Sequence, residues 1–147
     1  MGNAASVGRG LRDFLSKTMR DVMILAADNV TNSTPVDTGH AASNWILSLG
    51  SPFAGVVGSR ENVDWSVQQA GIQKIRGYDI GRHGPRIFLR NNVFYMQYLD
   101  KGWSQQAEPG FVAKALMGGA RAAPHGRKQA VRRMLRNMAR AAYMKGA

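Results

Sequence analysis

At residues 34–39 the chain reads Thr34-Pro35-Val36-Asp37-Thr38-Gly39, and a strand-like run from Asn44 to Leu49 follows. Pro35 has no backbone N–H and disfavours a helical conformation at the residue before it, so a preceding helix should end there. Asp37 is expected to accept hydrogen bonds from the next backbone N–H groups in an Asx-type turn. Gly39 can adopt a positive φ without steric cost. The stretch therefore predicts a structural turn that leads from a helix into a sheet.

The segment before this turn, from about Val7 to Asn32, has the periodicity of an amphipathic helix. Its predicted core face carries apolar residues at helical spacing, with charged residues opposite. These apolar residues are Leu11, Leu15, Val22, Ala26 and Val30. A helix packed on the core is the favoured interpretation. The alternative is a contact surface for a partner, formed by Met19 and Met23.

The segment after the turn predicts a small antiparallel sheet. Alternation from Asn44 to Leu49 places Trp45 on the core face, where a buried indole removes about 150–250 Å² from water. A second strand at Ala54–Gly58 is expected to pair back as a hairpin, and Arg86–Asn91 reads as a further strand. We take the aromatic residues Trp45, Tyr95 and Phe111 as core anchors.

Glycines divide the remainder of the chain in this prediction. Residues 63–70 form a short helix that Gly71 ends, and residues 71–85 form an exposed Gly-rich loop. Residues 93–99 form a helix closed by Gly102, and Phe111–Met117 form another, broken by Gly118-Gly119. The predicted fold is α+β, with a small antiparallel sheet packed against a long N-terminal helix and C-terminal helices. Residues 1–120 form this domain, and residues 121–147 form a separate basic helix.

Composition limits the class of protein. The 147 residues suit one domain, and the absence of cysteine excludes disulfides and thiolate metal sites. No apolar run approaches the ~20 residues that span a bilayer, and residues 1–10 lack the apolar core of a secretory signal. We therefore expect a soluble cytoplasmic protein, with no membrane partner.

The net charge of +11 is concentrated near the C-terminus, where residues 121–147 hold eight basic residues and no acidic ones. Val131, Leu135, Met138 and Ala142 form the apolar stripe of a predicted helix from about residue 126. Its cationic face could contact nucleic acid, an acidic protein groove, or solvent only; a membrane surface ranks last. The candidate contact residues are Arg127, Lys128, Arg132, Arg133, Arg136 and Arg140.

Motifs for catalysis and for metal binding are missing from the sequence. His40, His83 and His125 are far apart in turn-like contexts, so we expect surface histidines. Neither a nucleophile elbow nor a phosphate-binding loop occurs. We predict no catalytic residues, no metal site and no cofactor.

Three segments resemble one family, the head-to-tail joining (neck or tail-completion) proteins of long-tailed bacteriophages. The first is the turn at residues 34–39 with Ser-Asn-Trp after it. The second is Asn91–Gly102, in which a strand leads into a Tyr-containing turn that ends at Asp100 and Gly102. The third is Glu108–Leu116, which resembles the family's Pro-Phe-x-x-x-Ala-Leu helix start but contains an inserted Gly110. The segments occur in family order, and the basic C-terminal end lies outside the pattern.

The resemblance implies a structural virion protein that is not an enzyme. Its copies would form a ring at the neck, with six favoured and twelve as the alternative. The ring would join the head connector or adaptor proteins to the tail terminator or tail tube proteins, and DNA would pass through its channel. The competing hypothesis is a small basic nucleic-acid-binding module, which would bind DNA tightly and with steep salt dependence.

Overall fold

The computed structural model describes residues 4–79 and 86–121, without the side chains of residues 119–121. The chain has the predicted α+β fold. Its elements, in order, are α1 (Ala4–Ser33), α2 (His40–Ser43), β1 (Ile46–Leu49), α3 (Ser66–Arg76), β2 (Ile87–Arg90), α5 (Met96–Tyr98), the π-helical turn η1 (Leu99–Trp103) and α6 (Phe111–Arg121).

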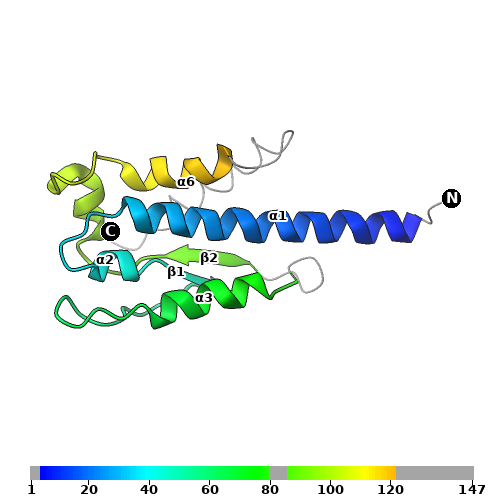
Figure 1. Ribbon diagram of the computed structural model, residues 1–147, viewed down its shortest axis with the longest axis horizontal. Coiled ribbons are helices and arrows are strands. Elements are labelled where there is room, and N and C mark those ends of the chain that lie inside the picture. The colour runs from blue at the N-terminus through cyan, green and yellow to red at the C-terminus, as the bar shows by residue number, and fades with distance from the viewer. Residues whose placement is uncertain (1–3, 80–85, 122–147) are drawn as a thin grey trace.

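Helix α1 is the axis of the molecule. Its C-terminal half lies between α6 on one side and the sheet with α3 on the other (Figure 1). In that half Met23, Ala26 and Val30 are almost completely buried, and they join a core that includes Trp45 and Leu116. These contacts hold the helix layer against the sheet, as the amphipathic pattern indicated.

The apolar face of α1 is covered over only part of its length, so the prediction for Leu11 and Leu15 is wrong. Leu11 is 54% exposed and Leu15 is 41% exposed, whereas Val22 is buried. Periodicity identified the apolar face correctly. However, α6 and α3 have 11 residues each and α1 has 30, so these two helices are too short to cover the whole face. Of the two methionines proposed as a partner surface, Met23 is in the core and Met19 is exposed.

The sheet contains two antiparallel strands among the described residues, with Leu47 opposite Leu89. The hairpin predicted at residues 54–58 is wrong, because these residues form a loop. Backbone groups of this loop bond to amide side chains in place of a strand. The Val57 N–H donates to Asn44 Oδ1 at 2.8 Å, Asn44 Nδ2 donates to the Val57 carbonyl at 3.0 Å, and Asn92 bonds the Phe53 carbonyl at 2.8 Å.

Three glycines predicted to end or break helices lie inside helices: Gly71 in α3, and Gly118 and Gly119 in α6. Helix α3 continues through Gly71 to Arg76, so the predicted loop 71–85 is wrong for residues 71–76, and residues 80–85 lie outside the described residues. A Cβ at Gly71 would lie 2.4 Å from the Leu47 carbonyl oxygen, and one at Gly118 would lie 3.1 Å from Asn29 Nδ2. Both glycines therefore permit close packing of a helix on its neighbour.

Candidate functional site

The turn at residues 34–39 is joined to the core through Thr34. Helix α1 ends at Ser33, as Pro35 predicted, and Thr34 is only 2% exposed. The Thr34 hydroxyl donates to the Val30 carbonyl at 2.6 Å and accepts a hydrogen bond from Trp45 Nε1 at 2.8 Å. The turn, the last turn of α1 and the buried indole are therefore one hydrogen-bonded unit.

The second half of the turn presents Asp37 to solvent. Gly39 has a φ of 90°, as predicted, and stands directly before α2. The turn hydrogen bond expected of Asp37 is made by Thr38, whose hydroxyl accepts from the His40 N–H at 3.3 Å. Asp37 instead forms an ion pair with Arg60, and both side chains are exposed. Such a surface pair contributes at most about 1 kcal/mol, so its significance is its place at the rim of a pocket.

His40 is buried and bonds to the second segment, which corrects the prediction of a surface histidine. It is 7% exposed, and its Nδ1 lies 3.1 Å from the Tyr95 hydroxyl. Tyr95 itself is only partly buried at the edge of the core, in contrast to Trp45. Burial raises the pKa of Tyr95 above 10.0; nearby Arg60 opposes the rise and Asp37 adds to it.

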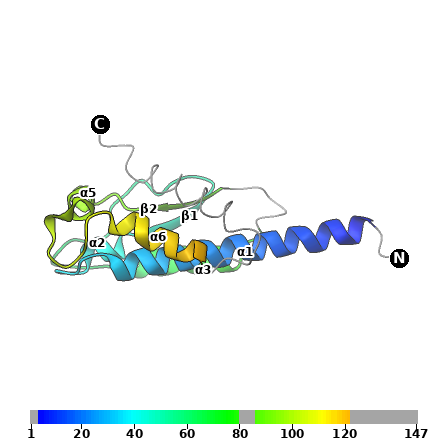
Figure 2. The ribbon, with the colours of Figure 1, turned by 90° about the horizontal axis from the view of Figure 1, so that it is seen from above.

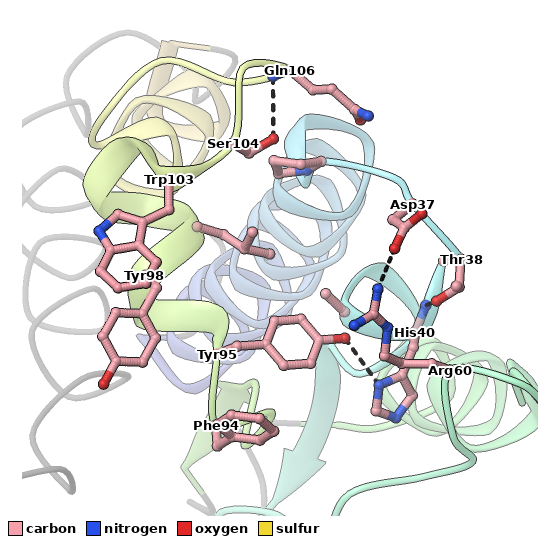
Figure 3. Close-up of a pocket in the computed structure, with 14 residues that line it drawn as sticks. Asp37, Thr38, His40, Arg60, Phe94, Tyr95, Tyr98, Trp103, Ser104 and Gln106 are labelled. Atoms are coloured by element: carbon pink, nitrogen blue, oxygen red, sulfur yellow. Dashed lines mark hydrogen bonds and ion pairs between the residues drawn. The ribbon is translucent and has the colours of Figure 1, made fainter.

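A pocket of about 430 Å³ opens between the turn and residues 94–106 (Figure 3). Tyr98 and Trp103 pack together in its wall with ring centroids 4.6 Å apart, and Phe94 meets Tyr95 edge to face at 5.2 Å. Phe94 is 80% exposed and Trp103 is 75% exposed. We name this the aromatic pocket; its principal lining residues are Asp37, His40, Arg60, Tyr95, Tyr98 and Trp103. Its size and aromatic walls suit a few inserted side chains.

The second and third segments meet at the start of α6. The Asp100 carboxylate accepts from the Val112 N–H at 2.9 Å, and the Asp100 carbonyl accepts from the Gly110 N–H at 2.7 Å. These bonds satisfy donors that have no partner within the helix. Gly110, the departure from the family pattern, has a φ of 76°, and Phe111 directly after it is buried in the core.

All three resembling segments thus converge on one end of the molecule. His40 and Tyr95 join the first to the second, Asp100 joins the second to the third, and Gln106 between them accepts from the Val36 N–H at 3.0 Å. Sequence reasoning missed Arg60, Phe94 and Trp103 as site residues. Phe94 and Trp103 flank the Tyr-containing turn of the second segment, and this was an available signal. Nothing in the sequence pairs Arg60 with Asp37.

Among residues 4–79 and 86–118, no three His, Asp or Glu side chains gather as metal ligands would. None of the described helices is long and apolar enough to cross a bilayer. His83, His125 and the basic contact residues between Arg127 and Arg140 lie outside the described residues.

Comparison with protein-family models, with curated proteins and with solved structures finds no match to this chain.

Proposed function

We propose that this protein is a structural subunit of a bacteriophage neck, where a ring of its copies joins the DNA-filled head to the tail. The observation that carries the proposal is the convergence of three separated segments. The turn at residues 34–39 with the Ser-Asn-Trp after it, residues 91–102 and residues 108–116 resemble parts of one family. The His40–Tyr95 contact, made directly after Gly39, and the Asp100–Val112 bond bring them together. A chance resemblance would not require the three segments to build one end of the molecule.

The chemistry of this end suits binding between proteins. Exposed aromatic side chains beside a pocket are typical of the residues that dominate interface energy, because binding removes a large apolar area of each from water. Phe94 and Trp103 are such side chains, and the Asp37–Arg60 pair adds a polar rim. The joint would therefore form by surface complementarity, without chemical turnover.

By the same resemblance, the ring has six copies, with twelve as the alternative. Its neighbours are head connector or adaptor proteins on one side and tail terminator or tail tube proteins on the other. DNA passes through its channel. Seven basic residues and no acidic ones lie in residues 122–147. A strongly cationic channel wall would retard DNA, so we assign this segment to a protein partner.

Purified virions provide the test of location. Mass spectrometry should detect the chain in virions that have been washed and separated from cell debris. Gold-labelled antibodies against it should bind at the junction of head and tail. A chain found in the infected cell but absent from such virions would contradict the proposal.

The charge of residues 122–147 favours the second candidate, a nucleic-acid-binding module. In that case the isolated protein binds duplex DNA tightly, and the logarithm of affinity falls linearly with the logarithm of salt concentration. Arg133→Gln and Arg136→Gln together would reduce the slope by about 2. A neck subunit should show at most weak, non-specific binding.

A further inference from the structure

The exposed large apolar side chains form two groups within the described part of the chain. Five lie in the N-terminal half of α1, and five lie in the turn, the loop 50–65 and the segment 94–103. The first group is Val7, Leu11, Phe14, Leu15 and Met19; the second is Val36, Val56, Trp65, Phe94 and Trp103. Val7, Leu11, Leu15 and Met19 recur at intervals of four residues, and we name them the N-terminal stripe. Such clustering distinguishes interaction surfaces from scattered exposed residues.

The two groups lie at opposite ends of the molecule. In Figures 1 and 2 the N-terminal half of α1 extends away from the other helices, whereas α2, α5 and the pocket segments lie at the other end. A 30-residue helix spans about 45 Å. The N-terminal stripe therefore cannot enter the aromatic pocket of its own chain, but it can reach that of another copy.

The charges of the two ends are complementary. Residues 4–20 carry four basic residues and one acidic residue, a net +3. The stretches that form the pocket end, residues 34–65 and 91–110, carry five acidic and two basic residues, a net −3 in a chain of +11. The C-terminal segment 122–147, with seven basic residues and no acidic ones, would instead repel the N-terminal half of α1. Charge thus favours the pocket end of a second copy as the occupant.

We propose that the N-terminal stripe of one copy docks into the aromatic pocket of the next copy. Leu11 and Leu15 would cover Trp103 and Phe94, and Arg12 would approach Asp37 at the polar rim. The two surfaces differ, so the contact is heterologous and closes into a ring when the rotation between copies allows it. That the copies close into a ring rests on the proposed function. The inference adds which two surfaces of the chain form the contact between neighbouring copies.

Single cysteines test the contact directly, because the chain has none of its own. The variants are Leu11→Cys, Trp103→Cys and the control Asp13→Cys, which lies about 200° round the helix from Leu11. Pairs are mixed at the highest concentration at which the full chain stays soluble, then oxidised. Leu11→Cys with Trp103→Cys should give a disulfide-linked dimer in several-fold excess over Asp13→Cys with Trp103→Cys. Each variant oxidised alone should give little disulfide-linked dimer.

Equal yields from Leu11→Cys and Asp13→Cys, or no link to Trp103→Cys, would overturn the inference. A link between Leu11→Cys and Met138→Cys within one chain would overturn it in favour of the C-terminal segment. A second variant, Leu11→Ser, should weaken self-association roughly tenfold. Its melting temperature should stay close to that of the native chain, because Leu11 is exposed. Failure of these links would leave the virion location of the protein, measured separately, unaffected.

Discussion

The Tyr95 hydroxyl lies 3.1 Å from Nδ1 of His40, across 55 residues of sequence. This contact joins the turn after α1 to the segment that leads into α5. It also fixes the back of the aromatic pocket, since both residues line it. Because Tyr95 is only partly buried, it packs against the core and also lines the aromatic pocket.

Tyr95 provides a prediction about pH. Its burial favours the neutral phenol, so the pKa is raised in the folded state above 10.0. The contribution of Tyr95 to stability is therefore fully present below its ordinary pKa of 10.0 and is lost as pH rises through the raised pKa, because the unfolded chain ionises first. The difference in phenolate absorbance between the native chain and Tyr95→Phe should have a midpoint above 10.0. A midpoint at or below this value would show that burial does not control the phenol.

The bond from Trp45 to Thr34 predicts a large effect from a small substitution. Thr34→Val keeps the shape but leaves the buried indole N–H without an acceptor, which costs about 1–3 kcal/mol of the free energy of unfolding. Urea denaturation followed by tryptophan fluorescence measures this. Thr34→Ser retains the hydroxyl and is the matched control, with a smaller loss. Equal stability of Thr34→Val and the native chain would contradict the account.

Two glycine-to-alanine substitutions should change stability in opposite directions. Gly71→Ala places a Cβ 2.4 Å from the Leu47 carbonyl oxygen and should destabilise the fold, although alanine favours helix. Gly10→Ala lies in α1 with no atom within 4 Å of the added Cβ. It should raise the free energy of unfolding by up to about 1 kcal/mol. A stabilising Gly71→Ala would mean that α3 does not pack as closely on β1 as the structure shows.

Asp100 is expected to stabilise the start of α6. Asp100→Ala removes the acceptor of the Val112 N–H and should cost about 1 kcal/mol, as at other capped helix termini. Asp100→Asn keeps an acceptor oxygen and should lose less. Both are measured by thermal melting followed by circular dichroism. Equal losses in the two variants would point to charge, and not to the cap, as the cause.

Local chemistry made some features predictable from sequence. The end of α1 before Pro35, the positive φ of Gly39 and the α+β class followed from rules that act over a few residues. The same holds for the amphipathic face of α1, although the sequence could not tell that its N-terminal half is left exposed. Coverage depends on the lengths of the neighbouring helices, which are set elsewhere in the chain.

The features that sequence missed depend on distant partners. Gly71 resembled a helix breaker because the Leu47 carbonyl that requires a glycine there is 24 residues away in sequence. The segment around Val57 was predicted as a strand, but its backbone bonds to the Asn44 side chain and not to another strand. The aromatic pocket was missed for the same reason, since Arg60 and Trp103 come to line one pocket only in the folded chain.

Electron microscopy of particles from an infection in which this gene carries an early stop codon would show whether the chain joins head to tail. If the protein is a neck subunit, such particles should be DNA-filled heads beside separate, finished tails, with joining restored when the native chain is supplied in trans. Normally joined virions in the absence of the chain would contradict the neck function.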